Sequence, residues 1–149
     1  MKRKEMGFAW PARLEAQRDG HVLVSFRDLP EALTEGDDRA DAITEAADCL
    51  EEAIAGRLAR GDDIPVPSRA AADEVFVSLS PLFGAKAALH VALRREGLSQ
   101  RELARRLGCD EREIRRLLDP KHGSKIERIS EALAALGSRL TIRVEPRAA

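Results

Sequence analysis

The sequence predicts an α+β fold, with a β-β-β-α-β order in residues 1–80 and a helical region with a final strand in residues 81–149. Apolar residues recur at every second position in several segments of the first half, as in strands, and at helical spacing through most of the second. The charge divides at the same place, because residues 1–80 carry 10 Lys or Arg against 17 Asp or Glu, whereas residues 81–149 carry 15 against 9. We therefore expect two domains, 1–80 and 81–149, that meet different partners.

Three strands are expected before residue 37. The first has four apolar residues on one face, Phe8, Trp10, Ala12 and Leu14, and Pro11 between them indicates that one edge of this strand is unpaired. The dipeptide Asp19-Gly20 signals a hairpin turn. A second strand follows with Val22, Val24 and Phe26 on one face, and residues 32–34 can form a short third strand. Residues 74–79 are expected to return as the fourth.

A long helix should lie between the third and fourth strands. Asp38 is placed to cap it, with Asp41 in the first turn, and Gly61 ends it. Its apolar stripe is Ile43, Ala46, Ala47, Leu50, Ala53, Ile54 and Leu58, and acidic residues line the opposite side. Residues 64–67, with two prolines, are read as a stiff extended linker.

The carboxylates of Asp37, Asp38, Asp41 and Glu45 resemble the acidic groups of a metal-dependent nuclease. They gather at one helix N-terminus, where capping and solubility explain them, and no strand residue faces them with a clear spacing. His21, His90 and His122 share no metal spacing, and Cys49 and Cys109 are expected to be buried free thiols. We predict no catalytic residue, no metal and no cofactor.

The second half contains three capped helices after a first one that begins at Pro81. Ser99 and Glu102 form a capping box, Gly108 ends that helix, and Asp110 with Glu113 begins the next. Two short helices joined at a glycine, the second rich in arginine, are typical of a helix-turn-helix. A plain helical hairpin with a solvated arginine face is the alternative.

A helix-turn-helix would place base-reading residues on its second helix, because arginine binds guanine and glutamate accepts from cytosine. A glutamine at the start of the first helix can hold a phosphate together with its backbone amide. The candidate DNA-binding residues are Gln100, Arg101, Glu111, Arg112, Arg115, Arg116 and Lys121.

The last segments are a helix and a strand. Ser124 and Glu127 suggest a third capping box, and Leu140, Ile142 and Val144 alternate as in a strand. Because a lone strand needs a partner, we expect it to pair with its twin in a homodimer or tetramer, or to dock on the N-terminal sheet. No apolar run approaches the roughly 20 residues that span a membrane, so a cytoplasmic protein is expected.

Several stretches resemble the HicB antitoxins in the right order. They are the segment from His21 to Pro30, the segment Leu33-Thr34-Glu35-Gly36-Asp37 before a long helix, and the linker Ile64-Pro65-Val66-Pro67-Ser68. Arg27 stands where the family pattern has a proline, and Glu31-Ala32 where it has Gly-Cys. The segments from Leu98 to Pro120 and from Ala135 to Gly137 resemble the Cro/repressor-like helix-turn-helix of one HicB branch.

The resemblance implies a type II antitoxin whose N-terminal domain is a degraded, non-catalytic RNase H-like fold. It would bind a HicA-type toxin, a small basic protein that cleaves mRNA, and its C-terminal domain would bind operator DNA and repress its own operon. The acidic balance of residues 1–80 suits a basic toxin. The candidate toxin-binding residues are Phe26, Asp28, Glu45, Asp48 and Glu52. A stand-alone regulator that senses another ligand or protein, and an RNase H-like nuclease, are the alternatives.

Overall fold

The computed structural model describes residues 4–146 and has an α+β fold. The four strands form one antiparallel sheet in the order β3-β2-β1-β4, with bounds Ala9–Ala16 for β1, Val22–Phe26 for β2, Leu33–Gly36 for β3 and Glu74–Ser78 for β4. The helices of this part of the chain are α1 (Arg39–Arg60), α2 (Pro81–Glu96), α3 (Gln100–Leu107), α4 (Glu111–Leu118) and α5 (Ile126–Ala135). The predicted order of elements is confirmed up to α5.

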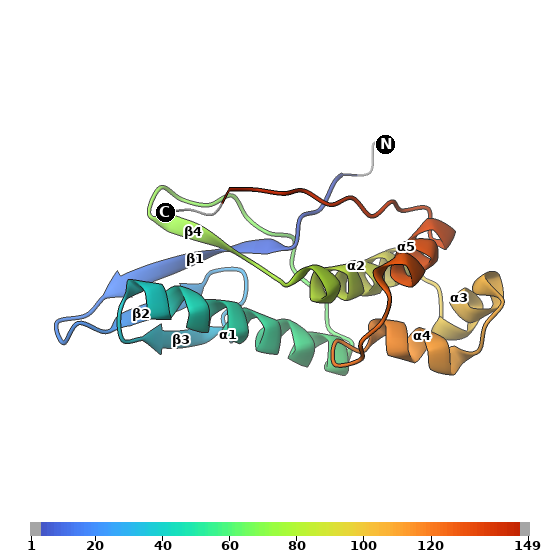
Figure 1. Cartoon of the computed structure of the whole chain (residues 1–149), viewed down its shortest axis with the longest axis horizontal. Coiled ribbons are helices and arrows are strands. Elements are labelled where there is room, and N and C mark those ends of the chain that lie inside the picture. The colour runs from blue at the N-terminus through green and yellow to red at the C-terminus, as the bar shows by residue number, and fades with distance from the viewer. Residues whose placement is uncertain (1–3, 147–149) are drawn as a thin grey trace.

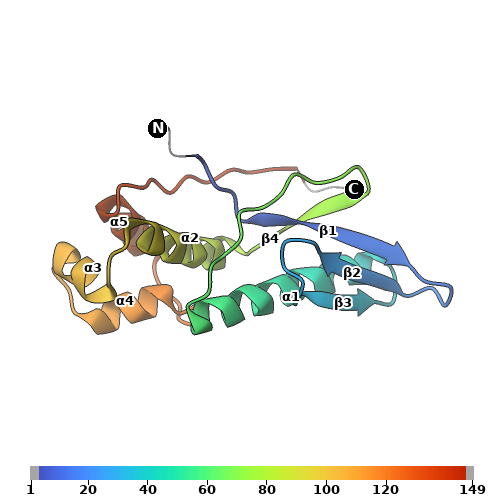
Figure 2. The same ribbon diagram turned by 180° about the vertical axis from the view of Figure 1, so that it is seen from behind.

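Helix α1 runs along the sheet, and α2 to α5 gather at one end of the molecule (Figures 1 and 2). The buried stripe of α1 is Ala42, Ala46, Leu50 and Ile54. The predicted stripe was wrong in its first turn, because Ile43 is 42% exposed and Ala42 is buried instead. Ala42 lies where α1 approaches β3 most closely, because a Cβ added at Gly36 would be 2.2 Å from the backbone nitrogen of Ala42.

Strand β1 lies inside the sheet, so the expectation that one of its edges is unpaired was wrong for the strand as a whole. It pairs with β4 from Ala9 to Arg13 and with β2 from Ala12 to Ala16. Pro11 lies opposite Phe76 of β4, one residue before the pairing with β2 begins. A residue without an N–H is therefore tolerated there because the ladder on its β2 side has not yet started.

Buried apolar residues form two clusters. The first joins the sheet, α1 and the linker, and contains Trp10, which is fully buried and donates from Nε1 to the carbonyl oxygen of Pro65 at 3.0 Å. The second joins α2, α3, α4 and α5. Helix α2 contributes to both, with Ala87 in the first cluster and Leu89 in the second. Trp10 is therefore a core residue of the first cluster.

The C-terminal segment, residues 138–146, forms no strand. It runs back past α2 toward the sheet (Figures 1 and 2), but Ile142 is 73% exposed and Val144 is 92% exposed. The expectation of a strand docked on the N-terminal sheet was therefore wrong, because this segment has no hydrogen-bonded neighbour strand. Pairing with a second copy of the chain stays a prediction.

Candidate nucleic-acid interface and partner surface

Helices α3 and α4 begin and end at the predicted residues. Ser99 Oγ accepts from the Glu102 N–H at 3.0 Å, and Asp110 Oδ1 accepts from the Glu113 N–H at 2.9 Å. Gly108 ends α3 with a φ of 67°, in the left-handed region that favours glycine. The Glu102 carboxylate accepts from Arg105 Nη2 at 2.6 Å. The turn between the two helices is thus fixed by local bonds.

The inner faces of α3 and α4 meet in the second cluster. Leu103 and Ile114 are fully buried, and Ala104 is 3% exposed. Arg128 of α5 donates from Nε to Glu113 Oε1 at 2.7 Å, which lowers the pKa of Glu113 and raises that of Arg128. This pair attaches the first turn of α4 to α5.

The last turn of α4 is held by Lys86, a fully buried residue of α2. Its Nζ donates to the carbonyl oxygens of Arg116 at 2.8 Å and Leu117 at 3.2 Å, and to Ser124 Oγ at 2.7 Å. Burial lowers the pKa of Lys86, while the nearby Asp119 raises it. The sequence signal was available, because Lys86 interrupts the apolar stripe of α2.

Ser124 does not begin a third capping box, so that expectation was wrong. The N-cap of α5 is Lys125, without a side-chain cap bond. Ser124 Oγ instead accepts from Lys86 and donates to the carbonyl oxygen of Arg116 at 3.3 Å. Its hydroxyl belongs to the end of α4 rather than to the start of α5.

Some arginines of the second half form ion pairs with carboxylates, and others have no partner in the part of the chain that the structure describes. Arg105 and Arg106 pair with Glu102, Arg128 pairs with Glu113, and Arg94 pairs with Asp63. The predicted DNA-facing cations are all exposed and, within residues 4–146, have no side-chain hydrogen bond or ion pair: Arg101, Arg112, Arg115, Arg116 and Lys121. The free cations among the predicted DNA-binding residues therefore lie on α3, on α4 and in the loop that follows α4.

The two remaining candidates for this interface differ in exposure. Glu111, in the first turn of α4, is exposed, whereas Gln100 at the start of α3 is half-buried. The backbone N–H groups of a first turn have no partner within the helix and suit a phosphate oxygen. Gln100 is therefore placed for contact through its backbone amide.

The candidate toxin-binding residues separate into exposed and internal ones. Glu45, Asp48 and Glu52 are exposed along α1, at helical spacing and without a side-chain bond in the described chain. Phe26 is only 2% exposed in the first cluster. Asp28 is half-buried, and its carboxylate accepts from the Ser68 N–H at 2.8 Å and from Ser68 Oγ at 2.6 Å. Phe26 and Asp28 thus support the fold, while the outer side of α1 is open to a partner.

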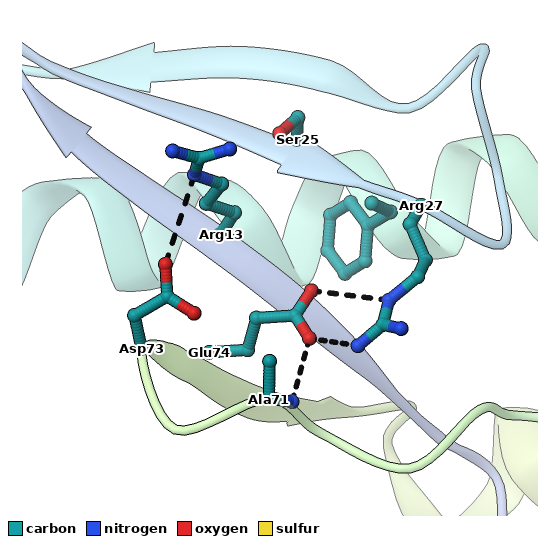
Figure 3. A pocket seen from close by; sticks show the side chains of 7 residues that line it. Arg13, Ser25, Arg27, Ala71, Asp73 and Glu74 are labelled. Atoms are coloured by element: carbon teal, nitrogen blue, oxygen red, sulfur yellow. Dashed lines mark hydrogen bonds and ion pairs between the residues drawn. The ribbon is translucent and has the colours of Figure 1, made fainter.

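A shallow cavity of about 370 Å³ lies where β1, β2 and the segment before β4 meet (Figure 3). Glu74 is bound on two sides there, by Arg27 and by the N–H of Ala71 at 2.7 Å, and its pKa is lowered as a result. Arg13 reaches Asp73 at 3.9 Å and Glu15 at 2.9 Å. The sequence pattern missed the pairs Arg27–Glu74 and Arg13–Asp73, since they join residues 47 and 60 positions apart.

The acidic residues at the start of α1 serve its cap. Asp38 Oδ1 accepts from the Asp41 N–H at 2.8 Å, and Asp41 Oδ2 accepts from the Asp37 N–H at 2.8 Å. In residues 4–146 no group of three or more His, Cys, Asp or Glu side chains is placed to hold a metal ion. The thiols of Cys49 and Cys109 are free and half-buried rather than buried, and partial burial raises their pKa values.

Comparison with known proteins adds the family. The family described as the HicB_like antitoxin of bacterial toxin-antitoxin system matches residues 9–88. Antitoxin HicB 1 of Photorhabdus laumondii subsp. laumondii is 36% identical over 136 residues, which is 91% of this chain and 86% of that protein. Antitoxin HicB of Escherichia coli (strain K12) is 35% identical over 133 residues, or 89% of this chain and 96% of that protein.

The chain belongs to the HicB-like antitoxin family.

Both relatives cover the helices α3 to α5 as well as the sheet, since they match about nine tenths of this chain. The two departures from the HicB pattern have partners in this structure. Arg27 pairs with Glu74 and donates to the carbonyl oxygen of Arg69 at 2.9 Å, and Glu31 accepts from Arg57 Nε at 2.6 Å. No helix in the described part of the chain is long and apolar enough to cross a membrane.

Proposed function

We propose that this HicB-like chain is a type II antitoxin that neutralises a HicA-type mRNA-cleaving toxin in the cytoplasm and represses its own operon by binding operator DNA. The observation that carries the proposal is the position of the unpaired candidate side chains. Glu45, Asp48 and Glu52 on the outer side of α1 have no partner within residues 4–146, and neither do four arginines on α3 and α4 and Lys121 in the following loop. An RNA-cleaving toxin is basic and DNA is acidic, so the two surfaces suit two different partners.

On this proposal α3 and α4 are a helix-turn-helix, and residues 81–149 form the DNA-binding domain. Helix α4 would enter the major groove with Glu111, Arg112, Arg115 and Arg116 toward the bases. The amides that begin α3, with Gln100 and Arg101, and Lys121 in the loop would bind phosphates, which set the register of the protein on DNA.

Residues 1–80 form the toxin-binding domain in the same proposal. Glu45, Asp48 and Glu52 make an acidic strip that would attract a basic toxin and orient it. We propose no catalytic role for this domain, because two of the four carboxylates that suggest one, Asp38 and Asp41, are bound within the cap of α1.

The assembly that binds the operator is proposed to be a homodimer or tetramer. The segment with Leu140, Ile142 and Val144 alternates apolar and polar residues and is without a neighbour strand, so pairing with the same segment of a second copy would bury its apolar face. Deleting residues 139–149 should convert the oligomer to a monomer, so that light scattering gives the mass of one shortened chain. An unchanged oligomeric state would contradict a dimer formed through this segment.

The experiment that tests the function is co-expression with the adjacent short reading frame, if that frame encodes a small basic protein with a histidine. We expect a stable complex on a tag carried by this chain and rescue of growth from the small protein's toxicity. Reversing Glu45, Asp48 and Glu52 to lysine together should weaken the complex, whereas Glu127→Lys on α5 is the matched control and should not. Operator binding without any complex or toxicity would instead indicate a stand-alone regulator.

A further inference from the structure

Helix α2 joins the two halves through three consecutive residues. Ala85 is buried in the second cluster, Lys86 donates to the end of α4, and Ala87 is buried in the first cluster with the sheet and α1. A helix is stiff over a single turn, so these three contacts fix the direction of α2 relative to both clusters.

Both ends of α2 are bound to the N-terminal half as well. At the start of α2, the Ser80 N–H donates to Glu51 Oε1 of α1 at 3.0 Å. Toward its end, Arg94 Nη2 lies 2.9 Å from Asp63 Oδ1 and Nη1 donates to the carbonyl oxygen of Gly61. These contacts tie α2 to α1 and to the linker that follows it.

Helix α4 has only eight residues and is attached at two points. Arg128 of α5 holds Glu113 in its first turn, and Lys86 of α2 holds the carbonyl oxygens of Arg116 and Leu117 in its last turn. A cation is favoured at a helix C-terminus, where several carbonyl groups have no partner within the helix. The ammonium group has three N–H donors, and the three oxygens around it accept all of them.

We propose that Lys86 is the positioning residue that sets the orientation of α4 relative to α2 and to the N-terminal half. The inference rests on the proposed function, in which α4 reads the operator. The turn that Lys86 holds carries Arg115 and Arg116, and Ser124, its third partner, closes the loop that carries Lys121. Lys86 therefore places base-reading and phosphate-binding residues together without touching DNA.

Sequence-specific and non-specific DNA binding depend differently on the orientation of α4. A bidentate contact of arginine with guanine needs fixed distances and directions, whereas attraction to the phosphates depends mainly on the number of cations. Loss of Lys86 should therefore lower the preference for operator DNA over other DNA, with a smaller effect on non-specific affinity.

The test compares Lys86→Met, which keeps the length of the side chain, with Lys125→Met, which removes an exposed lysine without a side-chain bond. Each variant is titrated with the DNA immediately upstream of the operon, that is, of whichever of this coding sequence and the adjacent short reading frame comes first, and with a random duplex of equal length. We expect the preference for the upstream DNA to fall about 10-fold in Lys86→Met, because a fall of that size corresponds to the loss of one base contact. The preference should stay unchanged in Lys125→Met.

Ser124→Ala is a milder variant that keeps the test possible if Lys86→Met does not fold. It removes one of the three acceptors of Lys86 and leaves both carbonyl oxygens. It should lower the preference in the same direction by a smaller factor, while binding of the co-expressed small protein is unchanged. An unchanged preference in folded Lys86→Met, or in Ser124→Ala if Lys86→Met does not fold, would overturn the positioning role. Failure of the unaltered chain to prefer the upstream DNA would instead overturn the proposed function.

Discussion

Replacing Gly36 with alanine is expected to lower the free energy of unfolding of the N-terminal half. The loss should be larger than for the two other glycine-to-alanine changes described below. A Cβ atom at Gly36 would lie 2.2 Å from the backbone nitrogen of Ala42, 2.5 Å from its Cα and 2.8 Å from the carbonyl carbon of Asp41. All three atoms belong to the backbone of α1, so no side chain can rotate to make room. Either α1 or the end of β3 has to move.

The size of that movement sets the cost. Ordinary contacts of a Cβ are 3.4–4 Å, so the first turn of α1 must withdraw by about 1 Å. Ala42 and Ala46 would then lose their close packing on the sheet, because interiors are packed too tightly to absorb a shift of that size. Overpacking typically costs about 1–3 kcal/mol, and a clash with backbone belongs at or above the upper end, about 3 kcal/mol or more.

Two glycines of the same half provide matched controls. Gly7 has open space and no positive φ, so Gly7→Ala should change the free energy of unfolding by only about 0.5 kcal/mol. Gly20 has open space but a φ of 91°, so Gly20→Ala should cost about 1 kcal/mol through backbone strain alone. The assay is denaturant unfolding followed by the fluorescence of Trp10, the one tryptophan of the chain. A Gly36→Ala protein within about 1 kcal/mol of Gly7→Ala would refute the reasoning.

Three further predictions concern α4 and the hairpin. Arg112→Ala and Arg115→Ala should each weaken operator binding by about 1–3 kcal/mol and random-duplex binding by less, and equal losses on both DNAs would make these arginines phosphate contacts. Asp110→Ala should cost about 1 kcal/mol of stability in thermal unfolding by removing the α4 cap, and an unchanged stability would contradict that role. His21 Nδ1 lies 2.9 Å from Asp19 Oδ2, which raises the pKa of His21 and lowers that of Asp19. The contact should therefore support the hairpin most between about pH 3.8 and pH 6.5, fade as the pH rises through the raised pKa of His21, and be lost as the pH falls through the lowered pKa of Asp19. An NMR titration in which Asp19→Asn leaves the pKa of His21 unchanged would oppose this account.

The elements that the sequence predicted best are those decided by neighbours in the chain. The caps at Asp38, Ser99 and Asp110 each accept from an N–H three residues later, so four residues contain the whole signal. The alternation of β2 predicts its buried face for the same reason, since one side of a strand is set by every second residue.

The failures share the opposite property, because each was decided by a contact with another element, or by the absence of one, and periodicity does not contain that information. Ser124 and Glu127 fit the capping pattern, yet Lys86, 38 positions earlier, takes up the Ser124 hydroxyl. Ile43 fits the apolar stripe, yet the closeness of Gly36 to α1 assigns the inner position to Ala42. Residues 138–146 have the alternation of a strand, but a strand also needs a neighbour, and periodicity carries no information on whether one is present.

The charged surface that a partner meets could not be predicted from net charge either, because ion pairs between distant segments occupy some of the charged side chains. In the second half, Arg94 forms an ion pair with Asp63, and Arg128 forms one with Glu113. In the first half, Glu31 pairs with Arg57 and Glu74 pairs with Arg27. The side chains left without a partner in residues 4–146 include three carboxylates along α1, four arginines on α3 and α4, and Lys121 in the next loop. These surfaces belong to different elements and share no residue, so on the proposed function toxin and operator can occupy one chain together. Helix α2, which packs in both clusters, is then the helix best placed to carry an influence of one on the other.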